Sequence, residues 1–139
     1  GHIDDFYSVA EHSVLVSRLV PEDVALWGLV HDVTEAFVPD IPRPFKDLIH
    51  GFDEFEEHLM RHVATHFNLP YPMPESVKYI DKNIVGDEAK VLFVNPPDWV
   101  KHYINVCDPL DIVGMSPAIA KAEFLDRFDE LYDKHTEEV

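Results

Sequence analysis

The sequence has few of the features that mark secreted, membrane or disulfide-stabilised proteins. Its 139 residues include a single cysteine, Cys107, so no disulfide can form within the chain, and we expect a reducing, cytoplasmic location. No apolar stretch approaches the roughly 18 residues of a membrane-spanning helix. The first residues also lack the basic region followed by an apolar one that forms a signal peptide. We therefore expect no membrane partner.

Cations are scarce as well. Only 11 Lys and Arg stand against 27 Asp and Glu, which gives a formal net charge of -16. A charge of this sign repels nucleic acids and anionic lipid surfaces, so we expect no nucleic acid polymer as a partner. It also repels free nucleotides, so an anionic substrate needs a bound metal ion or a few well-placed cations. The nine histidines, interleaved with carboxylates, are typical of a divalent-metal site.

The hydrophobic pattern predicts helices almost throughout. Apolar residues at helical spacing place His12 on the same face of a first helix as Val9, Val16 and Leu19. Further helices are expected at about 22–38, 53–67 and 75–94, with a short one at 98–105. Residues 111–115 are the one weak strand candidate. The pattern therefore predicts one compact all-α domain over residues 1–139.

Local signals predict where some of these helices begin. Asp53 followed by Glu56 resembles a capping box for the helix at 53–67. Ser116 as N-cap and Pro117 at the first position open the final helix. Prolines at positions 39, 42 and 44 predict a loop after the second helix.

Four residues on these predicted apolar faces indicate a metal site. His31 and Asp32 follow the wholly apolar run 25–30, which predicts a buried central helix. His12 lies on the apolar face of the first helix, and Asp81 on that of the helix at 75–94. Two histidines and two aspartates neutralise one divalent ion, and mixed nitrogen and oxygen ligands suit Mn, Fe, Co or Zn more than Ca. Taken singly, each histidine could also be a hydrogen-bonded core residue, and each aspartate could form a buried salt bridge or cap a helix.

Two glutamates are expected beside this site. Glu35 is predicted one helical turn beyond His31, at an angle between His31 and Asp32, where it could act as a base. Glu88 shares a face with Asp81, and we expect it to support the site through a hydrogen bond or salt bridge rather than to bind the ion.

Histidines also recur every four residues at His58, His62 and His66. Such pairs can chelate a metal ion. Glutamates flank them, so a solvated helix face is the favoured interpretation. A second ion held by His50, His58 and His62 remains the alternative.

The metal-site residues resemble the signature of the HD-domain phosphohydrolase superfamily, which is a histidine, a later His-Asp pair and a distant aspartate. A longer block resembles the 5′-deoxynucleotidase branch and its short phage relatives, among them dATP triphosphohydrolases. The block comprises His31, Asp32, Glu35, Asp40, Ile41, Pro42, Pro44 and Lys46. The resemblance runs from about residue 7 to residue 88, and more weakly to residue 128. It implies a single HD-domain helical bundle.

The resemblance also implies a metal ion and a catalytic base. One divalent ion (Mn, Co, Zn, Fe or Mg) would be bound by the four matching ligands, His12, His31, Asp32 and Asp81. Glu35 would orient or deprotonate the attacking water.

Contacts to the substrate are implied in the loop that follows. Asp40 would contact the sugar and Lys46 the phosphate, with Arg43 as the alternative phosphate ligand. A turn residue is the alternative interpretation of Asp40, and a solvated side chain that of Lys46. Members of the family usually carry an N-terminal helix with a phosphate-binding arginine. No Lys or Arg precedes His12, so we expect that phosphate contact to be absent, disordered or supplied by residues outside this sequence.

The resemblance and the predicted metal site together lead us to expect a metal-dependent phosphohydrolase of small nucleotides. Its expected reaction converts deoxynucleoside 5′-monophosphates to nucleoside and phosphate. A dNTP triphosphohydrolase is the alternative within the family, and a non-catalytic, nucleotide-binding HD module is an alternative of another class. An acidic DNA mimic would explain the charge, but it would not need buried His and Asp. We also expect a homo-oligomer that pairs through a helix face.

Overall fold

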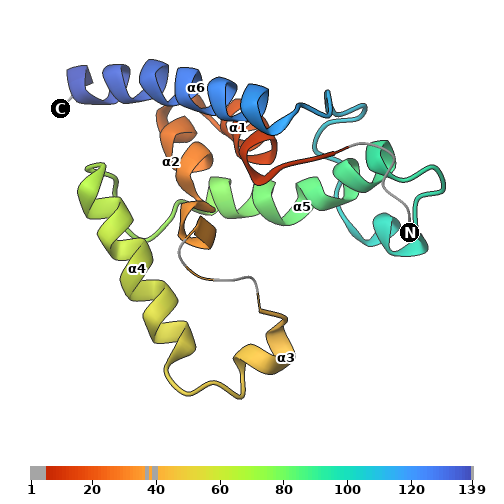
Figure 1. The fold of residues 1–139 in the computed structure, drawn as a ribbon, viewed down its shortest axis with the longest axis horizontal. Helices are drawn as coiled ribbons and strands as arrows, with labels where there is room; N and C mark the ends of the chain where they lie inside the picture. The colour runs from red at the N-terminus through yellow and green to blue at the C-terminus, as the bar shows by residue number, and fades with distance from the viewer. Residues whose placement is uncertain (1–5, 37, 39–40, 139) are drawn as a thin grey trace.

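The computed structural model describes residues 6–36, 38 and 41–138 (Figure 1). In this part of the chain helices are joined by turns and loops and no strand forms, so the predicted all-α fold is confirmed. The α-helices are α1 (Val9–Leu19), α2 (Ala25–Val30), α3 (Arg43–Lys46), α4 (Phe52–His66), α5 (Glu75–Leu92) and α6 (Pro117–Glu138). Three 3-10 helices lie between them: η1 (Glu22–Val24), η2 (Val33–Ala36) and η3 (Asp98–His102).

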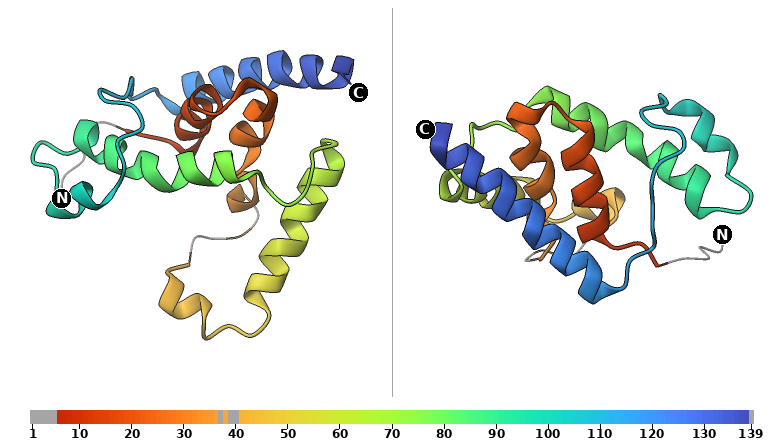
Figure 2. Two further views of the ribbon diagram at one scale, coloured as in Figure 1. Left: turned by 180° about the vertical axis from the view of Figure 1, so that it is seen from behind. Right: turned by 90° about the horizontal axis from the view of Figure 1, so that it is seen from above.

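The helices α1, α2, α5 and α6 form the body of the molecule, and α3 and α4 extend away from it (Figures 1 and 2). Every residue of α2 is buried, as its apolar run predicts. Gly28 of α2 lies so close to α1 that an added Cβ would approach the Ser17 Cα to 3.1 Å and the Val20 side chain to 3.0 Å. The absence of a side chain at this position therefore lets the two helices approach closely, which brings His12 toward His31.

The second helix ends earlier than the sequence predicts, so the expected continuous helix at 22–38 is wrong. The α-helical part stops at Val30, and the chain continues through a turn into η2. The His31 ring donates from Nδ1 to the carbonyl oxygen of Gly28 at 2.6 Å. In a continuing α-helix that carbonyl would accept from the amide of Asp32. The side chain competes for this acceptor, which favours the tighter 3-10 turn that follows.

Two further local predictions are wrong. The capping box does not form, because α4 begins at Phe52 after Gly51, whose φ of 78° lies in the left-handed region. Asp53 instead accepts a hydrogen bond from Arg43 at 3.0 Å. Residues 111–115 form a loop rather than a strand. The start of α6 is confirmed, since it begins at Pro117 and the Ser116 hydroxyl accepts from the amide of Ile119 at 3.4 Å.

A buried carboxylate ties the loop before α6 to α1. Glu11 is 2% exposed and accepts from the amides of Val113 at 2.8 Å, Gly114 at 3.3 Å and Met115 at 2.8 Å. This anchor fixes the start of α6 beside α1, where α6 closes one side of the site described below (Figure 2).

Within the described residues, no helix has both the length and the apolar character needed to cross a membrane.

Candidate metal centre and adjoining cavities

The four predicted metal ligands lie together in the structure. His12 comes from α1, His31 and Asp32 from the turn that follows α2, and Asp81 from α5. One ligand atom of each lies within 4.8 Å of the other three, and among the described residues this is the one such group of three or more His, Cys, Asp or Glu. The long-range convergence of three helices makes a chance arrangement of ordinary core histidines a poor explanation.

The spacing of these atoms fits a small divalent ion. An ion with bonds of about 2.1 Å separates neighbouring ligand atoms by roughly 3.0 Å at a right angle and roughly 3.4 Å at the tetrahedral angle. The Nε2 atom of His31 lies 3.3 Å from Nε2 of His12, 3.0 Å from Oδ1 of Asp81 and 3.2 Å from Oδ2 of Asp32. The Nε2 atom of His12 lies 3.3 Å from Oδ1 of Asp81 and 3.5 Å from Oδ2 of Asp32. The cluster could therefore hold a metal ion.

Hydrogen bonds orient both imidazole rings. The Nδ1 atom of His12 donates to Oε2 of Glu88 at 2.8 Å, as expected for a supporting carboxylate, and Nδ1 of His31 donates to the carbonyl of Gly28 at 2.6 Å. Each ring is thus held with Nε2 toward the centre of the cluster. Partners of this kind fix the tautomer and raise the basicity of a ligating histidine.

The charges in the cluster shift its proton affinities strongly. Burial lowers the pKa of His12, but hydrogen bonds to Asp81 and Glu88 outweigh it and raise that pKa to about 9. Burial likewise lowers the pKa of His31, whereas hydrogen bonds to Asp32 and Asp81 raise it to about 10. For Asp81 burial raises the pKa, but the two histidines hold it well below its usual range. A metal ion therefore competes with protons for these nitrogens.

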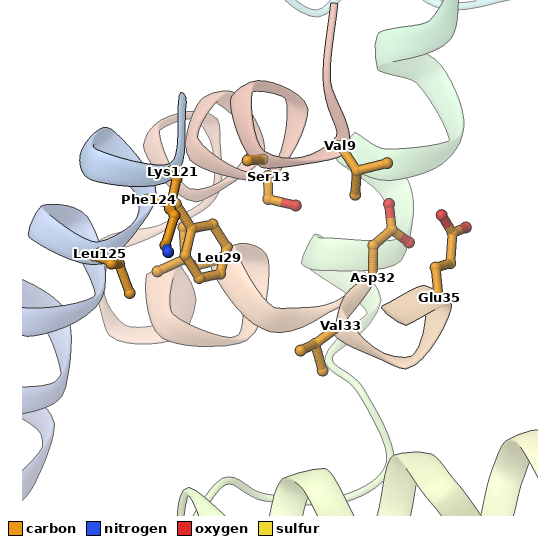
Figure 3. Close-up of a pocket in the computed structure, with 10 residues that line it drawn as sticks. Val9, Ser13, Leu29, Asp32, Val33, Glu35, Lys121, Phe124 and Leu125 are labelled. Carbon is orange, nitrogen blue, oxygen red and sulfur yellow. The ribbon is translucent and has the colours of Figure 1, made fainter. Parts of the chain in front are cut away.

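A polar cavity of about 390 Å³ opens onto the cluster. Glu35 and Glu88 line it together with three of the four cluster residues, His12, Asp32 and Asp81, and no Lys or Arg is among its described lining residues. Glu35 comes from η2 rather than from a continuing α-helix, yet its carboxylate still lies beside that of Asp32 (Figure 3). Glu35 therefore lies next to the predicted metal ligands, as expected, although it belongs to a 3-10 helix and not to a continuing α-helix.

Tyr7 also lines this cavity, and sequence reasoning missed it. Its hydroxyl is buried close to the carboxylate of Glu88. Burial and the negative charge of Glu88 raise the pKa of the phenol, so the hydroxyl stays protonated. Tyr7 precedes α1, where no helical spacing could have marked it.

A second cavity of about 370 Å³ lies between α1, α2 and α6. It shares Val9, Asp32 and Glu35 with the polar cavity, so the two meet at the cluster. Its walls are largely apolar, and Lys121, Phe124 and Leu125 of α6 contribute to them (Figure 3). Sequence reasoning did not link α6 to the site, because the residues of α6 lie 86 to 116 positions along the chain from the other residues that line the cavity.

The cations predicted to contact phosphate lie elsewhere. Arg43 and Lys46 belong to α3 and pair with carboxylates of α4, Arg43 with Asp53 at 3.0 Å and Lys46 with Glu56 at 3.0 Å. Neither residue lines the two cavities at the cluster. Asp40 lies outside the described residues. The substrate contacts expected of all three residues stay predictions.

The histidines of α4 do not join the cluster. His58 and His62 are exposed, with their Nε2 atoms 3.1 Å apart, and His66 is exposed as well. This agrees with the solvated helix face that the neighbouring glutamates predict. His50, His58 and His62 do not form a group of three metal-binding atoms in the described part of the chain.

Comparison with known proteins identifies similar chains. The chain is 35% identical over 133 residues to the uncharacterized protein YfdR of Escherichia coli strain K12, an alignment that covers 94% of this chain and 75% of YfdR. It is 36% identical over 83 residues to the uncharacterized protein RCAP_rcc00048 of Rhodobacter capsulatus, which covers 54% of this chain and 42% of that protein. No family model and no solved structure matches the chain.

Proposed function

The chain belongs to the YfdR family, and we propose that it is a divalent-metal-dependent phosphohydrolase that converts deoxynucleoside 5′-monophosphates to nucleoside and phosphate. The observation that carries this proposal is the convergence of His12, His31, Asp32 and Asp81 beside an open cavity that is also lined by Glu35. The resemblance of the same positions to the HD-domain signature supports it independently of the geometry.

Different residues of this chain would have different roles in the reaction. Bound at the cluster, a Mn, Co, Zn, Fe or Mg ion would polarise a phosphoryl oxygen and lower the pKa of water. His12 and His31 present fixed Nε2 atoms because Glu88 and the Gly28 carbonyl hold their other nitrogens. Glu35 would accept a proton from the water whose oxygen bonds to phosphorus, and would return it to the 5′ oxygen as the bond between phosphorus and that oxygen breaks, which yields phosphate and nucleoside.

The electrostatics of the cavity favour a monophosphate over a triphosphate. Two glutamates line the polar cavity besides the aspartates of the cluster, and no cation does among its described lining residues. A triphosphate carries several more negative charges than one divalent ion can neutralise, so these carboxylates would repel it. A monophosphate is largely neutralised by the ion itself.

One set of assays tests the proposal. Protein freed of metal with a chelator is reconstituted separately with Mn²⁺, Co²⁺, Zn²⁺ and Mg²⁺ and given deoxynucleoside mono- and triphosphates, with phosphate and triphosphate both quantified. We expect metal-dependent release of phosphate from the monophosphates. Release of triphosphate would identify the triphosphohydrolase instead, and nucleotide binding without turnover would identify a non-catalytic module.

A pair of histidine variants provides the control. His31→Ala removes a predicted ligand, and we expect it to abolish both metal retention and phosphate release. His62→Ala removes an exposed histidine of α4 that lies outside the cluster, and we expect it to match the parent. Equal metal content in the two variants, measured by elemental analysis, would exclude the cluster as the metal site.

A further inference from the structure

The apolar cavity between α1, α2 and α6 has no role in the reaction proposed above. It meets the polar cavity at Val9, Asp32 and Glu35, so a molecule whose phosphate lies at the cluster can extend into it. Figure 3 shows the two carboxylates at one end, with Leu29, Phe124 and Leu125 toward the other. Its volume of about 370 Å³ falls within the range of roughly 300–1,000 Å³ typical of small-molecule sites.

The walls of this cavity suit a planar, largely apolar group. Six of its ten lining residues are aliphatic or aromatic: Val9, Ala10, Leu29, Val33, Phe124 and Leu125. A sugar has no large apolar face to match them, whereas a nucleobase has two and stacks well on an aromatic ring. Lys121 adds an ammonium group, which can only donate hydrogen bonds and therefore suits the acceptor atoms on the edge of a base.

Ser13 gives an independent indication of a ligand. The residue is 2% exposed and lines the cavity, and its hydroxyl is directed into it (Figure 3). No hydrogen bond of this hydroxyl is found among the described residues. By contrast, the hydroxyl of Ser17, one turn further along α1, donates to the carbonyl of Val14 at 2.6 Å and accepts from Arg127 at 3.0 Å. The Ser13 hydroxyl therefore keeps hydrogen-bonding capacity toward the cavity, which a ligand or an ordered water can use.

We propose that this cavity binds the base of the nucleotide, with Phe124 as the aromatic surface and Ser13 and Lys121 as polar contacts. This inference rests on the proposed phosphohydrolase function and extends it, because it assigns recognition of the organic part of the substrate to α6. The cluster then binds the phosphate, and the fit of the organic group in the apolar cavity determines which phosphate esters are hydrolysed efficiently.

Three variants and two substrates test the assignment. Ser13→Ala removes the hydroxyl without leaving a protein group unpaired, so its thermal stability should equal or exceed that of the parent. Leu125→Trp fills the cavity from its exposed rim. Ile119→Trp is the matched control, because Ile119 is also exposed on α6 but does not line the cavity. The substrates are a deoxynucleoside 5′-monophosphate and 2-deoxyribose 5-phosphate, which lacks the base.

For the nucleotide we expect kcat/KM to fall about tenfold or more in Leu125→Trp and about three- to tenfold in Ser13→Ala. Hydrolysis of 2-deoxyribose 5-phosphate should stay within twofold of the parent in both, and Ile119→Trp should change neither substrate. If Ser13→Ala and Leu125→Trp lower both substrates equally, or leave nucleotide hydrolysis unchanged, the base does not lie in this cavity.

A binding measurement separates failure of this inference from failure of the proposed function. Free deoxyadenosine and thymidine contain the base but no phosphate, so their binding, followed by NMR, requires neither metal nor turnover. If the parent hydrolyses neither ester, the proposed function fails, while weaker nucleoside binding in Ser13→Ala and Leu125→Trp than in Ile119→Trp still supports the cavity. Equal or undetectable nucleoside binding in all four proteins, together with that inactivity, would overturn both.

Discussion

Metal binding at the cluster should release protons and therefore depend steeply on pH. Hydrogen bonds to the surrounding carboxylates raise the pKa of His12 to about 9 and that of His31 to about 10. The cluster therefore holds excess protons at neutral pH, and a proton must leave Nε2 before that atom can bind an ion. Each released proton changes the logarithm of the binding constant by one per pH unit. The affinity should therefore rise by about tenfold for each proton released between pH 6.5 and 7.5.

The assay is a titration with Mn²⁺ in which the free ion is followed by EPR at half-unit steps from pH 6 to pH 8.5. Calorimetry at pH 7 in two buffers with different ionisation enthalpies counts the released protons directly. Glu88→Gln removes the carboxylate that helps raise the pKa of His12, so this variant should release fewer protons. Glu123→Gln, at a partly exposed pair with Arg18 on the surface of α6, should leave the count unchanged. An affinity that does not vary over this pH range would refute the reasoning.

Four further predictions concern the stability of the metal-free protein and the roles of Glu35, Glu11 and Asp40. In the metal-free protein, the raised pKa values of His12 and His31 contribute stability that is complete below about pH 6.5 and lost as pH rises through 9 to 10, which thermal denaturation with a chelator will reveal. Glu35→Gln should keep its metal, measured by elemental analysis, while single-turnover rates fall by about 10²–10⁴, since the amide cannot accept the proton. Glu11→Gln should lower the free energy of unfolding in urea by about 1–3 kcal/mol, because an amide presents one acceptor oxygen to three backbone donors; an unchanged unfolding midpoint would show that the loop is held by other contacts. Asp40→Ala should slow hydrolysis of ordinary deoxynucleotides by an amount equivalent to about 1–3 kcal/mol of lost transition-state stabilisation. It should affect a 2′,3′-dideoxynucleotide little, because that substrate lacks the 3′-hydroxyl of the sugar. Equal losses on both substrates would show that Asp40 only shapes a turn.

The sequence by itself determined which residues share a face of each helix. Helical periodicity assigns His12 and Asp81 to apolar faces, and the wholly apolar run before His31 predicts the buried helix at the centre of the fold. Buried faces of helices must meet in a domain of this size, so polar residues on several of them are forced together. The convergence of the four cluster residues could therefore be predicted without knowledge of which helices pack against one another.

The tertiary structure decided what local spacing does not encode. Periodicity cannot show that the His31 ring donates a hydrogen bond to the Gly28 carbonyl where α2 ends. This hydrogen bond depends on the ring orientation, which is set by the packing of the cluster. Periodicity also cannot show that Lys46 forms an ion pair with Glu56 of α4, because that contact depends on the path of the chain between the two residues. The apolar cavity depends on α6 lying beside α1, and Glu11 fixes that arrangement through amides about a hundred residues away. Contacts of this range arise only when the whole chain has folded, because their partners are set by the packing of complete helices and not by neighbours in sequence.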